Sequence, residues 1–145
     1  MQKTQPSAEE CADQILTALP VIMRALWQRL QAETPLPVTW AQFGLLSLLY
    51  SRPFTLTELA RTWGVSKPTM SRTVGLLTGR GWIVSQKDLA DRRRKPLSLT
   101  PVGREIHERM REIVRQKLVS PLDPLDETQR TQIVSALDLL LRTLA

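Results

Sequence analysis

The sequence predicts a mainly α-helical chain with one small β-hairpin, an α+β fold in a single domain. Three observations predict this class. Apolar residues recur every three or four positions in six segments, as on one face of a helix. Three of these segments begin with Ser or Thr followed three residues later by Glu or Gln. Two short runs with strand composition enclose a basic segment near the middle of the 145-residue chain.

Two helices are expected before the central part of the chain. Ser7 and Glu10 have the spacing of a capping box, and the helix they open continues to about residue 33. Pro20 lacks an amide hydrogen, so we expect a kink or a restart there. Thr39 and Gln42 form a second capping box, which opens a helix to about residue 50. This second helix is apolar on nearly all sides and is therefore expected to be buried.

Two short helices joined by a tight turn come next. Thr55 and Glu58 form the third capping box, and Gly64 is placed to take a left-handed conformation after the short helix. Ser66 is the expected N-cap of a helix over residues 67–80, with Pro68 in its first turn. The spacing turns three apolar side chains of this helix inward: Met70, Val74 and Leu77.

A hairpin and two further helices complete the chain. Residues 82–86 and 96–100 are the expected strands, and residues 87–95 between them carry five basic and two acidic side chains. A helix–turn–helix followed by such a hairpin is a winged helix-turn-helix, here over residues 34–100. Helices follow over residues 101–120 and 126–144, and Pro121 and Pro124 are expected to break the first of them.

The helices at the two ends of the chain predict a homodimer. Their apolar stripes, in residues 1–33 and 101–145, exceed what one winged helix needs to cover itself. A second copy of the chain is the expected partner for this surface. The alternative is a self-contained helical cap in a monomer.

The distribution of charge predicts a polyanionic partner. The net charge is +6, and residues 52–104 alone carry 11 basic and 3 acidic side chains. A single cysteine excludes a disulfide framework within the chain. A single histidine leaves too few ligands for a metal site and no basis for a catalytic triad. We therefore expect neither a cofactor nor an enzymatic activity. The sequence has no membrane-spanning run and no secretory signal, which favours a cytoplasmic protein.

The helix over residues 67–80 is the expected major-groove element, because the second helix of such a motif enters that groove. Its outward side chains are donors, and Arg72 has the geometry to bind a guanine edge. The basic hairpin tip is expected to enter the minor groove, with Asp91 orienting an arginine. A solvated polar helix face and a weak surface ion pair are the alternatives. The candidate DNA-binding residues are Ser66, Lys67, Thr69, Ser71, Arg72, Thr73, Asp91, Arg92, Arg93 and Arg94.

These segments resemble the MarR family of transcriptional regulators over nearly the whole chain. The matching residues are Leu59-Ala60, 63–66, 69–72, 77–81, and above all 91–95 followed by 99–103. The resemblance implies an obligate homodimer whose two wings straddle a palindrome, acting most often as a repressor. It also implies an effector site between the dimer helices and the DNA-binding lobe. By position, Arg93 is the minor-groove arginine and Asp91 its partner.

Other residues permit narrower interpretations. A first interpretation is a pocket that binds a small aromatic acid. The residues of this pocket would be Arg24, Trp27, Trp40 and Arg52. The alternative is that the tryptophans are core residues, which is more common for tryptophan at helical spacing. Cys11 lies where some relatives have a peroxide-sensing thiol, but an ordinary, partly buried thiol is favoured. His107 is expected to be a solvated helix residue. The alternative function is a winged-helix protein-interaction module or a non-specific architectural DNA-binding protein.

Overall fold

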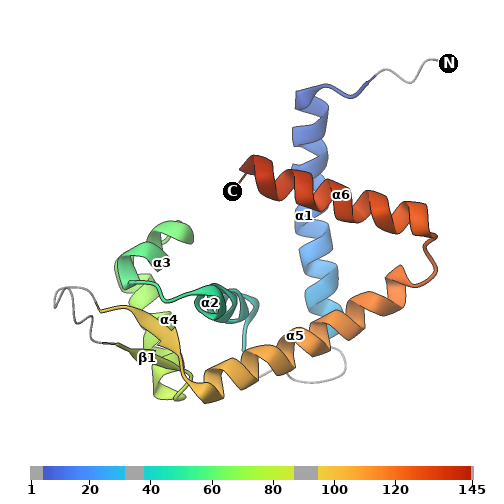
Figure 1. Ribbon diagram of the computed structural model, residues 1–145. Helices are drawn as coiled ribbons and strands as arrows, with labels where there is room; N and C mark the ends of the chain where they lie inside the picture. Colours follow the sequence, from blue (N-terminus) through green and yellow to red (C-terminus); the bar gives the residue numbers. More distant parts are fainter. Residues whose placement is uncertain (1–4, 32–37, 87–94, 145) are drawn as a thin grey trace. The chain divides into compact units, whose positions relative to one another are not determined.

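The computed structural model describes residues 5–31, 38–86 and 95–144, and in these ranges it contains six helices and one two-stranded sheet (Figure 1). The mainly helical fold class with a small hairpin is thereby confirmed. The chain divides into two compact units. We call residues 34–112 the winged-helix unit and residues 1–33 with 113–145 the terminal unit. The elements are α1 (Ala8–Gln31), α2 (Trp40–Ser51), α3 (Leu56–Thr62), α4 (Lys67–Gly79), β1 (Ile83–Ser85), β2 (Leu97–Leu99), α5 (Pro101–Leu122) and α6 (Glu127–Leu144).

All three predicted capping boxes are present. The Thr39 hydroxyl accepts a hydrogen bond from the Gln42 amide, and the Gln42 side chain accepts one from the Thr39 amide. Thr55 and Glu58 make the same reciprocal pair at the start of α3. Ser7 exchanges equivalent bonds with Glu10 ahead of α1. These caps satisfy amides that have no partner in the first helical turn, so the helix starts were predictable.

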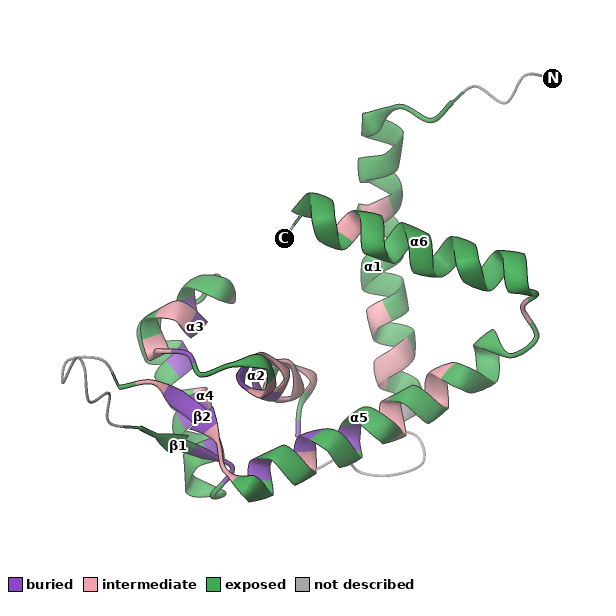
Figure 2. Ribbon diagram, viewed as in Figure 1, coloured by how far each residue is buried: buried purple, intermediate pink, exposed green. Residues whose placement is uncertain are grey.

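The core of the molecule lies in the winged-helix unit. Figure 2 shows buried residues on α2, on the sheet and on the first half of α5, whereas α6 has none. The apolar helix α2 is the centre of this core, as its composition predicts. The largest fully buried side chains are Leu45, Leu46, Leu59, Leu77 and Ile83.

The two strands form an antiparallel hairpin at the edge of this core. Ile83 pairs with Leu99, and Ser85 pairs with Leu97. A third segment joins the sheet, because Phe54 and Leu97 exchange backbone hydrogen bonds of 3.1 and 2.7 Å. The sequence does not predict this bridge, since a single residue between Pro53 and Thr55 has no strand pattern. The bridge ties the start of α3 to the base of the wing.

The first turn of α5 lies directly on the backbone at the base of the wing. The Thr100 amide donates to the Trp82 carbonyl at 3.0 Å, and the Thr100 hydroxyl donates to the Gly81 carbonyl at 2.6 Å. The same hydroxyl accepts a bond from the Gly103 amide at 3.0 Å. A Cβ atom on Gly103 would lie 2.0 Å from the Trp82 oxygen. Only glycine therefore fits at this position of the helix.

The terminal unit differs in two details from what the sequence predicts. Pro20 lies inside α1, which continues through it to Gln31, so of the expected kink or restart the restart does not occur. One missing backbone hydrogen bond does not end a helix that has three further turns to form. Pro121 likewise lies inside α5, which ends one residue later at Leu122. Among the described residues, no helix has the length and apolarity that crossing a bilayer requires.

Candidate nucleic-acid interface

Helices α3 and α4 are joined by a turn whose geometry is set by Gly64. Its φ of +61° lies in the left-handed region, as predicted, where a residue without a Cβ atom has no steric penalty. The next amide, that of Val65, bonds back to the Ala60 carbonyl at 3.0 Å and closes the end of α3. Ser66 then caps α4 by accepting a bond from the Thr69 amide. The turn thus fixes α4 to α3 and to the core.

Helix α4 has one buried face and one exposed face. Met70, Val74 and Leu77 are buried, as predicted, and they anchor the helix. The predicted DNA-binding residues are exposed, apart from Thr73, which is half-buried; they are Ser66, Lys67, Thr69, Ser71 and Arg72. The exposed face contains no acidic residue. The hydrogen-bond donors therefore lie on the side of α4 that faces away from the core, where a partner can contact them.

The hydroxyl groups on this face are held by the helix itself. The Thr69 hydroxyl lies 2.8 Å from the Ser66 hydroxyl, and the Thr73 hydroxyl donates to the Thr69 carbonyl at 3.4 Å. Arg72 makes neither an ion pair nor a hydrogen bond with any residue that the structure describes. Its side chain is exposed and can reach an acceptor outside the chain. A guanine edge or a phosphate provides such an acceptor.

The base of the wing is described, but its tip is not. Strands β1 and β2 bring the chain to Gln86 and back from Lys95, which is exposed. The four predicted contacts of the tip, Asp91, Arg92, Arg93 and Arg94, lie outside the described residues. The register of the hairpin places the two ends of this basic segment side by side, with the Gln86 amide donating to the Pro96 carbonyl at 2.7 Å.

The four residues predicted for an aromatic acid are not brought together within one unit. Arg24 and Trp27 belong to α1 in the terminal unit, whereas Trp40 and Arg52 belong to the winged-helix unit. Trp40 is the first residue of α2 and Arg52 follows its last, so about 18 Å of helix separates them. The Arg52 guanidinium lies over the Phe54 ring at 3.7 Å and 3.8 Å from Glu58. The Arg52 side chain therefore packs beside the residues that cap α3.

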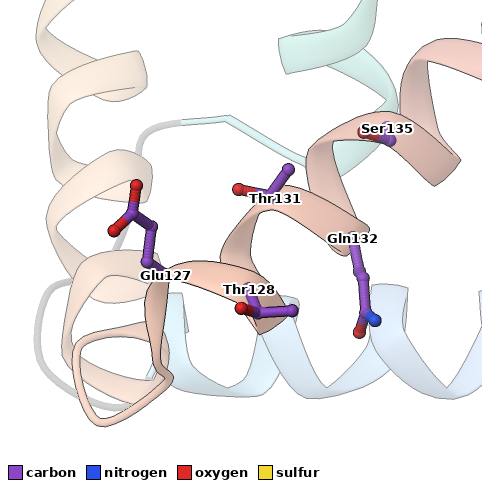
Figure 3. Close-up of a pocket in the computed structure, with 5 residues that line it drawn as sticks. All are labelled: Glu127, Thr128, Thr131, Gln132 and Ser135. Carbon is purple, nitrogen blue, oxygen red and sulfur yellow. The ribbon is translucent and has the colours of Figure 1, made fainter.

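Two hollows of the terminal unit contain none of these four residues. One, of about 360 Å³, runs along α6 (Figure 3); it is lined by the polar residues Glu127, Thr128, Thr131, Gln132 and Ser135. The other, of about 590 Å³, is mostly apolar and lies between α1 and α6; it is lined by Pro6, Glu10, Cys11, Gln14, Ile15, Ala136, Leu139 and Leu140. Cys11 is exposed, so the expected partial burial of its thiol is wrong. Nowhere in the described ranges do three acidic, His or Cys side chains form a metal-binding group.

His107 is buried, contrary to the expectation of a solvated residue. It is 4% exposed and lies between α2 and α5. Its ring stacks on Phe43 and lies 4.5 Å from the Tyr50 ring, centroid to centroid. The signal in the sequence was its spacing: position 107 lies four residues after Gly103 and three before Met110, which are both buried. It is therefore part of the core stripe of α5.

Ser47 on α2 is the polar contact of the His107 ring. The Ser47 hydroxyl donates to the Phe43 carbonyl at 3.0 Å, and its oxygen lies 3.0 Å from the His107 Nε2 atom. When the Ser47 proton is used in this way, Nε2 is the donor of the second bond. Nδ1 has no partner among the described residues.

The pKa of His107 is lowered from its ordinary value of 6.5, chiefly by burial and then by Arg111 and Arg104, while Glu108 opposes the shift. The unfolded chain therefore binds a proton at a pH where the folded chain does not. We expect the free energy of unfolding to decrease as the pH falls below 6.5. Urea unfolding at pH 7.5 and 5.5 measures this change.

His107→Gln is the matched variant, because its amide keeps a donor toward Ser47 but does not titrate. The loss of stability between pH 7.5 and 5.5 should be smaller in this variant than in the unchanged chain. Equal losses in the two proteins would show that other groups cause the pH dependence.

Comparison with known proteins agrees with this geometry. Residues 36–94 match the model of the MarR family. An uncharacterised HTH-type transcriptional regulator of Staphylococcus aureus is 37% identical over 57 residues, which are 39% of this chain and 39% of the relative. The chain thus spans about two fifths of the length of the curated relative it matches.

The fold is similar to that of solved structures. A mutant MarR from E. coli has a TM-score of 0.75 and 22% identity, with 97% of this chain and 99% of that chain covered. BpsR of Bordetella bronchiseptica, whose DNA binding is regulated by 6-hydroxynicotinic acid, has a TM-score of 0.67 and 24% identity. Its match covers 94% of this chain and 97% of that chain. At these identities the likeness shows the fold.

Proposed function

Because residues 36–94 match the model of the MarR family, we propose that this chain is a member of that family and a sequence-specific DNA-binding regulator of transcription. The single observation that carries this proposal is the exposed face of α4. It presents Arg72 without any described partner, flanked by threonine and serine hydroxyls and by no acidic residue. A helix of this kind fits the major groove, where base edges differ in donors and acceptors. The wing residues Asp91 to Arg94 are proposed as the minor-groove contact.

The regulator is proposed to act in the cytoplasm as a homodimer on a palindromic operator. The support is the apolar surface of the terminal unit, where several large side chains are more than half exposed; they are Leu16, Leu19, Val21, Ile22, Val134, Leu137, Leu139, Leu141 and Leu144. A second copy covers such a surface by symmetry. The two copies of α4 would then occupy half-sites about 34 Å apart.

Repression relieved by an aromatic acid is the proposed mode of regulation. The support is that BpsR, a protein of similar fold, has its DNA binding regulated by 6-hydroxynicotinic acid. A guanidinium binds a carboxylate with two parallel hydrogen bonds, and an indole stacks on an aromatic ring, so arginine and tryptophan are the side chains that suit such an acid. The effector would have to favour the conformation that does not bind DNA.

Arg72→Ala tests the proposed function. It should weaken binding to the selected operator by about 1–3 kcal/mol and relax the preference at one base position. The measurement is a titration against the operator and against single-base variants of it, at one fixed salt concentration. Competition with random duplex should show that the unchanged protein prefers its operator by a factor of about 10³ or more.

Two outcomes would contradict the proposal in different ways. Equal weakening of all sequences by Arg72→Ala would make Arg72 a phosphate contact. An unchanged protein that binds random duplex as tightly as any selected sequence would be a non-specific architectural protein. Lys67→Ala is the matched control, because a lysine at the start of α4 contributes mainly a charge and should weaken all sequences alike.

A further inference from the structure

One large apolar side chain on α4 is not explained by the core. Leu76 is 60% exposed, whereas its neighbour Leu77 is fully buried. Leu76 therefore contributes little to the packing of α4 against the winged-helix unit. Its neighbours Gly75 and Gly79 have no side chain, and a Cβ atom added to either would meet nothing within 4 Å. The leucine side chain thus projects alone from a helix surface that is otherwise polar or bare.

The position of Leu76 relates it to the proposed contacts of α4. Thr69, Arg72, Thr73 and Leu76 have the spacing i, i+3, i+4 and i+7, which places them along one face of a helix. Seven residues of helix extend about 10.5 Å, which is close to the length of three base pairs. Known recognition helices contact bases with residues at this same spacing. A helix that binds through Arg72 and lies along the groove over its whole length therefore also brings Leu76 to the base edges.

The major groove contains one apolar group on its base edges, the C5 methyl group of thymine. The other edges present donors and acceptors, which an isobutyl side chain would leave without a partner. We propose that Leu76 is a specificity-determining residue that recognises a thymine methyl group in each half-site. This inference rests on the proposed function and deepens it, because it assigns one base of the operator.

Replacing thymine with deoxyuridine tests this inference, because deoxyuridine lacks the methyl group and keeps the same hydrogen-bonding edge. Duplexes are first selected from a random pool with the unchanged protein. Each thymine of one selected half-site is then replaced in turn, and dissociation constants are measured for the unchanged protein and for Leu76→Ala. At one position the unchanged protein should bind about fourfold more weakly, as expected for one buried methyl group. Leu76→Ala should show no such difference there.

Two controls separate this effect from a loss of structure or of general affinity. Leu76→Ala should unfold at the same urea concentration as the unchanged chain, because the deleted atoms are exposed. Val102→Ala removes methyl groups from another exposed apolar side chain, 53% exposed in the first turn of α5, and should keep the full response to deoxyuridine.

The possible results distinguish a failure of this inference from a failure of the proposed function. If deoxyuridine has no effect at any position, or if Leu76→Ala keeps the whole response, Leu76 does not recognise a methyl group. The second result would assign the methyl contact to Thr69 or Thr73 and leave the proposed function intact. If the pool yields no enriched sequence, the proposed function fails, and the inference fails with it.

Discussion

Replacing Gly103 with alanine is expected to lower the free energy of unfolding by about 3 kcal/mol, at the upper end of the cost of overpacking a core. The added Cβ atom would lie 2.0 Å from the Trp82 oxygen and 2.8 Å from its carbonyl carbon. Both contacts are with backbone, which cannot rotate away as a side chain can. The first turn of α5 would have to leave the base of the wing, which breaks the bonds made by Thr100.

The measurement is urea unfolding followed by circular dichroism. Gly75→Ala and Gly79→Ala in α4 are the matched controls, because a Cβ atom at either position meets nothing within 4 Å. Alanine favours a helix interior over glycine, so these two variants should be unchanged or more stable by up to about 1 kcal/mol. A Gly103→Ala variant as stable as the controls would show that α5 can pack elsewhere.

The double variant Leu137→Glu with Leu141→Glu is expected to abolish the proposed dimer. Both side chains lie on the exposed face of α6, at 55% and 67% exposure, so the change costs the isolated chain little. In a dimer the four introduced carboxylates would lose their hydration at the interface. Binding to a palindrome should weaken about 100-fold or more, because two half-sites would no longer be occupied by one linked molecule.

Sedimentation equilibrium at micromolar concentration measures the dimer, and a titration with the selected duplex measures the affinity. Gln132→Glu, on the polar side of α6 shown in Figure 3, is the control and should leave both unchanged. A monomeric unchanged protein would refute the dimer. A dimeric double variant would place the interface on other residues of the terminal unit.

Local signals in the sequence predicted much of the winged-helix unit. The capping boxes, the left-handed Gly64 and the buried side of α4 each depend on residues within one or two turns of the chain. The Phe54 bridge to Leu97 depends instead on residues 43 positions apart, and no local pattern predicts it. Gly103 belongs to a segment that resembles the family, but its role, the close approach of α5 to the Trp82 carbonyl, required the structure. The prediction of a solvated His107 was wrong because its charged neighbours Glu105 and Glu108 point elsewhere on α5, whereas its spacing from Gly103 and Met110 places it on the buried stripe.

The burial of His107 also gives the molecule a built-in spectroscopic reporter. The chain contains a single histidine, so its imidazole resonances need no assignment by mutation. The nitrogen chemical shifts distinguish a ring protonated on Nε2 from the other tautomer and from the imidazolium ion. A titration with duplex or with an aromatic acid that altered the Ser47 contact would shift these signals. A movement of α2 relative to α5 would thus be detected in solution through the contact between the His107 Nε2 atom and the Ser47 oxygen, without attaching a label.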